Sequence, residues 1–252
     1  MASRRLADLT SPAFAELLAQ RGPVILLTIG SVEPHGPHLP LGTDTIISDA
    51  AALRAAALLE ARGLPTLIAP AVPYGVTEFA QGFPGAMGIS AETLTALLTE
   101  VVRGMLTAGA RHVCLVNNHL EPAHDQAIRA VTPSFDSRRV SVACPLTRRH
   151  ARTLSAEFKS GACHAGRYET SIVLAAQPAL VREAERAGLA EVPISLSEGI
   201  KAGKHSFLDM GMTAAYAGTP ALATSEHGDE QLDLLAAMIV SEVTEALEPP
   251  AP

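Results

Sequence analysis

The chain has 252 residues, of which 48% are hydrophobic, and a formal net charge of −7 at pH 7. Because α/β folds routinely reach this length without splitting, we expect a single domain over residues 1–252. The 19 basic residues form no long run, which argues against nucleic acid and against an anionic membrane surface as partners.

The cysteines and the apolar segments indicate a cytoplasmic protein. Cys114, Cys144 and Cys163 form no CxxC pair and cannot all pair within one chain, so we expect small core residues in a reducing compartment. The N-terminus lacks the apolar core of a signal peptide, and no apolar run approaches the roughly 18 residues of a membrane span.

The first third of the chain alternates strand and helix patterns. The apolar run 23–30 ends in glycine and predicts a buried strand, and the alanine- and leucine-rich segment 48–63 predicts a helix with Gly63 at its C-terminal end. A second strand is expected over 65–75. A glycine-containing loop over 74–88 follows it.

The same alternation continues to the C-terminus. Ser90 is expected to cap an amphipathic helix that ends at Gly109. The later elements are expected as strands over 112–118 and 140–144 and as helices over 121–130, 167–176 and 228–247. Alternating strands and helices are typical of parallel sheets covered on both faces. The fold prediction is therefore α/β, with a mostly parallel central sheet.

Two segments that follow predicted strands concentrate titratable side chains. "TIGSVEPHGPHLPLGTD" (28–44) contains Glu33 and His35, and the segment after strand 112–118 contains His119 and Glu121. Residues two apart in extended chain point to the same side, and ligands bind beyond the carboxyl ends of parallel strands. We therefore expect the two pairs to converge.

Asp44 adds a fifth group at the end of the first segment. One histidine and one glutamate for each of two divalent metal ions, with an aspartate bridging them, is a ligand set that such a pair prefers. Asp44 alone could equally cap the following helix, and a single His-x-Glu pair could be solvated. We expect His38 to make an outer hydrogen bond, and His124 stays open.

Four motifs together resemble the creatininase family of metal-dependent amidohydrolases. They are "GSVEPHGPHLPLGTD", "VNNHLEPAH", "HAGRYETS" and "GTPALATSEHG", in this order. The resemblance implies a three-layer α/β/α sandwich and a centre of two Zn, Mn or Fe ions. It also implies hydrolysis of a small amide, often cyclic, by metal-activated water, and a homo-oligomer, specifically a hexamer.

The family's metal ligands correspond to five residues of this chain. The resemblance implies Glu33, Asp44 and His119 for one ion, and His35, Asp44 and Glu121 for the other.

The family's catalytic positions correspond to His164 and Glu169. His164 precedes the predicted helix 167–176, whose dipole disfavours a charged imidazole and suits a proton acceptor; a helix-capping or core histidine is the alternative. Glu169 is expected to orient His164 or to bind the outer part of the metal site, or else to form a structural salt bridge.

The groups that bind creatinine in the family are missing here. The chain has no tryptophan, has Leu120 in place of a tyrosine, and has Gly161 in place of an aspartate. We expect Leu120, Tyr74 and Thr77 to contact a substrate other than creatinine.

Three functions remain from the sequence. The first is hydrolysis of a small, non-peptide amide. The second is a peptidase-like member of the family that trims a modified peptide in cofactor maturation. The third is a binder of small molecules without catalysis, although none of the expected ligands is lost.

Overall fold

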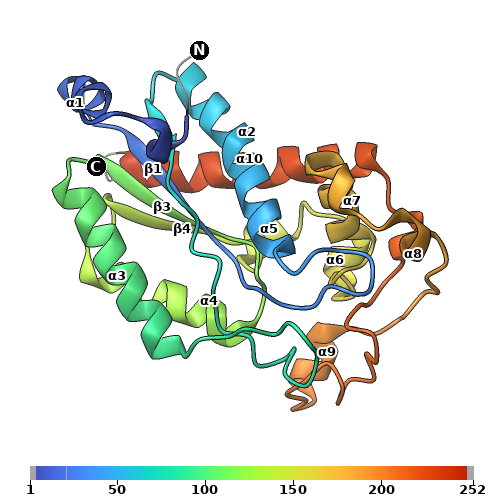
Figure 1. The fold of residues 1–252 in the computed structure, drawn as a ribbon. Coiled ribbons are helices and arrows are strands. Elements are labelled where there is room, and N and C mark those ends of the chain that lie inside the picture. The colour runs from blue at the N-terminus through green and yellow to red at the C-terminus, as the bar shows by residue number, and fades with distance from the viewer. Residues whose placement is uncertain (1–3, 21, 249–252) are drawn as a thin grey trace.

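A parallel sheet forms the centre of the computed structural model, which describes residues 4–20 and 22–248. Within these residues the sheet has four strands in the order β2-β1-β3-β4. They are β1 (Val24–Ile29), β2 (Thr66–Ile68), β3 (His112–Asn117) and β4 (Val140–Ala143). Figure 1 shows helices above and below this sheet, so the predicted α/β fold with a parallel central sheet is confirmed.

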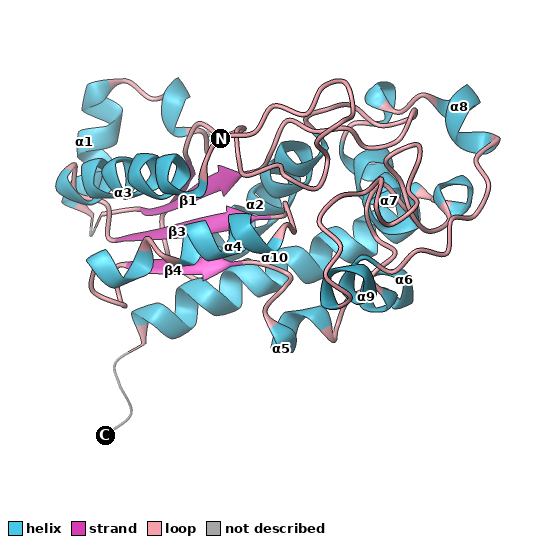
Figure 2. Ribbon diagram, turned by 90° about the horizontal axis from the view of Figure 1, so that it is seen from below, coloured by secondary structure: helices cyan, strands magenta, loops and turns pink. Residues whose placement is uncertain are grey.

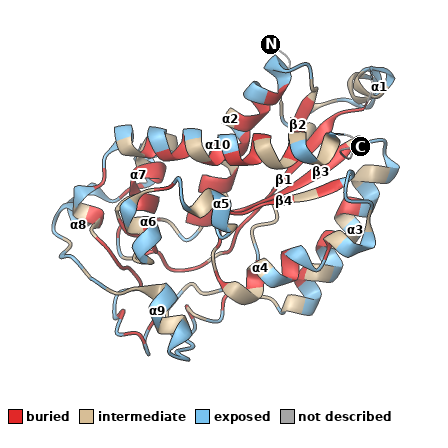
Figure 3. Cartoon of the chain, turned by 180° about the vertical axis from the view of Figure 1, so that it is seen from behind, coloured by how far each residue is buried: buried red, intermediate tan, exposed pale blue. Residues whose placement is uncertain are grey.

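Side chains that alternate along β1 enter two separate cores. Val24 and Leu26 pack into one core, which includes residues of α2 (Thr43–Ala61), α7 (Arg167–Ala176) and α10 (Ser225–Leu247). Ile25 and Leu27 pack into the other core, with residues of α3 (Ala91–Thr107) and α4 (Pro122–Arg129). Burial on both faces explains why β1 is apolar except for Thr28, whose hydroxyl donates to Asp49 at 2.6 Å. Figure 3 shows β1 buried along its length.

Shorter helices complete the described chain. They are α1 (Ser11–Ala19), α5 (Arg148–Ala151), α6 (Ala156–Ser160), α8 (Glu183–Ala187) and α9 (Leu196–Lys201). Figure 2 shows the strands pointing toward the side of the molecule that carries α5 to α9. None of the helices in the described part combines the length and the hydrophobicity needed to cross a membrane.

Two predicted elements have an end that differs from the structure by five residues or more. The strand expected over 65–75 is only Thr66–Ile68, because Pro70 and Pro73 have no N–H to donate to a neighbouring strand; beyond it only Val72 makes an isolated bridge to Ile29. The helix expected over 48–63 begins five residues earlier, at Thr43. This early start places Asp44 in the first helical turn.

The helices α7 and α10 lie very close together at Gly228. A Cβ atom at this position would lie 1.8 Å from the carbonyl oxygen of Ser171, whereas one at Gly104 on α3 would meet nothing within 4 Å. The close approach of α10 to α7 therefore requires glycine at position 228.

We expect Gly228→Ala to lower the free energy of unfolding by about 1–3 kcal/mol, because the added methyl group forces the two helices apart. Gly104→Ala is the matched control and should raise stability by up to about 1 kcal/mol, since alanine is the better helix former. Urea or thermal unfolding measures both. A Gly228→Ala protein as stable as the wild type would contradict this account of the α7 and α10 packing.

Candidate metal centre and cavity

The segments that follow β1 and β3 meet because the two strands are neighbours in the sheet. Glu33 and His35 come after β1, and His119 and Glu121 come after β3. All four are at most 6% exposed. The predicted convergence of the two pairs at the carboxyl ends of the strands is what the structure has.

The start of α2 brings Asp44 to the same place. The backbone N–H of Ser31 donates to Asp44 Oδ2 at 3.2 Å. A Cβ atom at Gly30 would lie 2.7 Å from the backbone nitrogen of Thr45, so the missing side chain lets the loop approach the helix. Asp44 is not the N-cap of α2, because Gly42 holds that position.

Both carboxylate oxygens of Asp44 face a histidine. His35 Nε2 lies 3.2 Å from Oδ1, and His119 Nδ1 lies 3.1 Å from Oδ2. Glu33 Oε1 is 3.2 Å from the same His119 nitrogen. Asp44 therefore has the position expected of a bridging group.

The two remaining carboxylates lie on opposite sides of this bridge. Glu121 Oε2 is 4.0 Å from His119 Nε2, and Glu169 Oε2 is 3.6 Å from His35 Nε2. Close groups of possible ligand atoms accordingly join Glu121 with Glu33 and His119, and Glu169 with His35 and Asp44; a third group joins His164 with Glu33 and His35. The resemblance instead pairs Glu121 with His35, so the ligand set beside His35 has two candidates.

Each histidine of the centre uses one ring nitrogen on a backbone carbonyl. His35 Nδ1 donates to the carbonyl of Glu33 at 3.0 Å, and His119 Nε2 donates to that of Val76 at 2.7 Å. The other nitrogen of each ring then points at the carboxylates. Ligating histidines commonly have such outer partners, which fix the ring and its tautomer.

A further network that the sequence analysis did not identify holds His119. Asn117, the last residue of β3, accepts a hydrogen bond from the backbone N–H of His119 at 3.0 Å. It also accepts one from His124 Nε2 at 3.1 Å. Its amide is a polar group at the end of an apolar strand, a signal that could have pointed to it. His124 thus supports the centre from outside, and His38 bonds to Thr170 Oγ1 at 2.8 Å.

The charges in the centre leave the histidines protonated when no metal is present. Burial opposes the charge on His35, but Asp44 and Glu169 outweigh burial and raise the pKa of His35 to about 10. The pKa of His119 is likewise held well above its usual range, because Glu33 and Asp44 outweigh its burial. A buried cluster of carboxylates needs positive charge nearby, which protons or metal cations can supply.

His164 lies beside the cluster with the opposite charge preference. Burial, together with His35 nearby, lowers the pKa of His164 to about 4. Its Nε2 donates to the carbonyl of Pro34 at 3.0 Å, which leaves Nδ1, 3.8 Å from Glu33 Oε1, free to accept a proton. Burial thus has the effect that the sequence analysis attributed to the dipole of α7.

The backbone after His164 is held by Glu169. Ala165 has a left-handed φ of 48°, and its N–H donates to Glu169 Oε2 at 2.7 Å. Alanine is uncommon in this conformation, and strained residues are frequent at functional sites. Glu169 therefore contacts both the metal-ligand cluster and the segment that carries His164.

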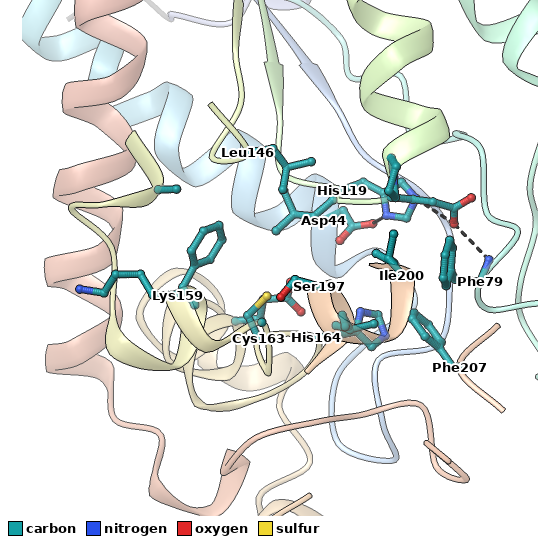
Figure 4. Close-up of a pocket in the computed structure, with 18 of the residues that line it drawn as sticks. Asp44, Phe79, His119, Leu146, Lys159, Cys163, His164, Ser197, Ile200 and Phe207 are labelled. Carbon is teal, nitrogen blue, oxygen red and sulfur yellow. Dashed lines mark hydrogen bonds and ion pairs between the residues drawn. The ribbon is translucent and has the colours of Figure 1, made fainter. Parts of the chain in front are cut away.

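A cavity of about 360 Å³ opens on the cluster. Figure 4 shows Asp44, His119 and His164 at its edge. The apolar residues that line it include Leu120, Leu146, Phe158, Ile200 and Phe207. Of the three predicted substrate contacts, only Leu120 is among the lining residues that the structure describes. Tyr74 is 48% exposed elsewhere, and the Thr77 hydroxyl bonds to that of Ser31.

Comparisons with known proteins place this geometry in a family. The creatininase family model, described as creatinine amidohydrolase, matches residues 7–243. A mycofactocin precursor peptide peptidase from Mycobacterium tuberculosis is 36% identical over 223 residues, which cover 86% of this chain and 82% of the relative. A creatinine amidohydrolase from Pseudomonas putida is 27% identical over 121 residues, 46% of this chain and 45% of that relative.

A solved structure supports the fold. The structure named "Creatininase Mn" has a TM-score of 0.71 at 22% sequence identity and covers 98% of this chain and 100% of its own chain. At this identity the likeness concerns the fold alone.

Glu169→Gln should change how stability depends on pH in protein kept free of metal with a chelator. Burial raises the pKa of Glu169 from its ordinary 4.5 to about 8, so the folded chain binds this proton more tightly than the unfolded chain. The stabilisation by this bound proton is fully present below about pH 4.5 and is lost as the pH rises toward about 8.

The variant has no carboxyl group to ionise at this position. We expect it to lose less free energy of unfolding than the wild type between about pH 5 and pH 8.5, measured by urea unfolding. Glu100→Gln on the surface of α3 is the control and should follow the wild type. Equal pH slopes for Glu169→Gln and wild type would contradict the burial of an ionisable carboxyl here.

Proposed function

This chain belongs to the creatininase family, and we propose that it cleaves a C–N amide bond with a pair of divalent metal ions. The observation that carries the proposal is Asp44, whose two carboxylate oxygens face two histidines from different strand ends. Within the described residues, the buried atoms Glu33 Oε2 and His35 Nε2 have no hydrogen-bond partner. A metal ion would satisfy both atoms, so the residues present fit the group.

The proposed ligands follow from these contacts. Glu33, Asp44 and His119 would hold one ion, and His35 and Asp44 the other. The resemblance assigns Glu121 to this second ion, whereas Glu169 Oε2 is the carboxylate oxygen found 3.6 Å from His35 Nε2. Histidine nitrogen and carboxylate oxygen suit Zn, Mn and Fe alike, so the donor set leaves the choice of metal open.

His164 is the proposed acid and base. The bound ions would supply an activated water, with a pKa toward about 7, and a polarised amide carbonyl. His164 Nδ1 would accept a proton from the attacking water and deliver it to the departing nitrogen. Its Nε2 stays bonded to Pro34 throughout, which keeps the ring oriented.

For the substrate we favour a peptide-like amide over the small non-peptide amide that the sequence analysis placed first. The Mycobacterium tuberculosis relative is named for a precursor peptide. An apolar cavity beside the cluster suits an extended chain with apolar side chains. Gly161 lies on the wall of the cavity and has no carboxylate that could bind creatinine. A Cβ atom at this position would lie 2.7 Å from Ser197 Oγ, so the wall has little room for a larger residue there.

The remaining alternatives have less support. A binder without catalysis is not favoured, because the chain keeps all five expected ligands and His164. The homo-hexamer and the cytoplasmic location stay predictions.

We expect His164→Ala to lower kcat by about 10²- to 10⁴-fold, the usual range for a positioned acid or base. Metal content should stay near that of the wild type, because His164 is not among the proposed ligands. Turnover is measured on the best substrate of the panel described next. Normal turnover in this variant would show that His164 has a structural role and is not the acid and base.

Steady-state kinetics with Zn, Mn or Fe supplied should separate the substrate classes. We expect metal-dependent hydrolysis of short peptides with apolar residues beside the scissile amide, and a creatinine kcat/KM below about 10⁴ M⁻¹s⁻¹, the lower end of ordinary enzyme efficiency. Lactams and formamides complete the panel. Efficient creatinine turnover, or hydrolysis of lactams alone, would overturn the peptide-like substrate.

A further inference from the structure

Three basic side chains outside the metal-ligand cluster line the cavity. They are Arg148 at the start of α5, Arg152 at its end and Lys159 on α6. All three are exposed. Within the described residues none of them has an ion-pair or hydrogen-bond partner, unlike Arg149 beside them, which pairs with Glu242 at 2.7 Å and with Glu245 at 2.6 Å.

The cavity therefore separates charges of opposite sign. Among the described residues, the acidic side chains that line it are those of the cluster, namely Glu33, Asp44, Glu121 and Glu169. Figure 4 shows His119 and Phe79 toward one end, Lys159 at the other, and Leu146 and Cys163 between them. A ligand that fits this arrangement has an apolar middle and a negative charge at the end remote from the cluster.

We propose that Arg148, Arg152 and Lys159 form a subsite for a carboxylate of the substrate, separated from the scissile amide by an apolar portion. The subsite rests on the proposed amide hydrolysis at the cluster. A guanidinium can bind a carboxylate through two parallel hydrogen bonds. The chain carries a net charge of −7, which would repel an anionic substrate, so local positive charge at the mouth favours its entry.

The size of the cavity limits what lies between the two ends. A volume of about 360 Å³ is near the lower limit of ordinary ligand pockets, which suits a short segment of chain. A C-terminal carboxylate and an acidic side chain are the two sources of such a charge in a peptide, and they are separated in the test below.

The probes are acetylated trileucine with a free C-terminal carboxylate, the same peptide with an amidated C-terminus, and acetylated Leu-Leu-Asp with an amidated C-terminus. The proteins are the wild type, the double variant Arg148→Ala/Arg152→Ala, Lys159→Ala, and, as a control, Arg149→Ala, which removes one paired arginine of α5. Hydrolysis is measured with the metal-loaded protein. Binding is measured by calorimetry. For any probe that the wild type hydrolyses, each protein also carries His164→Ala, so that the probe stays intact.

We expect the double variant to raise KM and Kd for the free acid by about tenfold, as the loss of charged hydrogen bonds implies. The kcat value should change less than about threefold, because the lost contacts are remote from the reacting bond. Lys159→Ala should have a smaller effect in the same direction. Arg149→Ala should match the wild type, and the amidated trileucine should bind all four proteins equally.

The outcomes separate this proposal from the proposed function. Hydrolysis of the acid and the amide with equal KM in the wild type would overturn the subsite and leave amide hydrolysis standing. Selective binding of the acid that the double variant loses, without any hydrolysis, would support the subsite and overturn the proposed function. Equal binding of the acid and the Leu-Leu-Asp amide would assign the subsite to any carboxylate, and binding of the acid alone would assign it to a C-terminus.

Discussion

The buried carboxylate of Asp44 is shared between two histidines, and the candidate site is arranged around this contact. His35 follows β1 and His119 follows β3, so the two ring nitrogens meet only because the strands are parallel neighbours. A carboxylate at 1% exposure is costly unless it is paired with positive charge. The cluster is thus held by the fold in a state that favours cations.

The surroundings of the cluster keep its groups in place. Backbone carbonyls of Glu33, Val76 and Pro34 each hold one nitrogen of a histidine. The loop after β2 is attached through Val76 and through the N–H of Glu78, which donates to Glu121 at 3.0 Å. Rings and carboxylates held in this way lose little entropy when they bind a ligand or a metal ion.

The sequence predicts most of what is local and little of what depends on long-range contacts. Periodicity identifies β1, β3 and α7. The two-residue spacing, together with the predicted parallel sheet, indicates that Glu33 and His35 converge with His119 and Glu121. Which glutamate lies beside His35 depends on where α7 packs against α2, and no spacing reports that.

The same cause applies to the predicted substrate contacts that do not line the cavity. Tyr74 and Thr77 lie on a loop whose course is set by distant backbone bonds, such as that of Met87 to the carbonyl of Val32. From the sequence, Arg148 and Arg152 are typical of a solvent-exposed helix surface. Only the structure places them on the wall of the cavity without a partner among the described residues.

Metal content measured by elemental analysis tests the central claim most directly, with the wild type compared with Asp44→Ala and His35→Ala. The account predicts about two transition-metal ions per chain in the wild type, none in Asp44→Ala, and loss of mainly one in His35→Ala, because Asp44 alone serves both. A wild-type protein without transition metal after reconstitution, or an Asp44→Ala protein that keeps both ions, would contradict it.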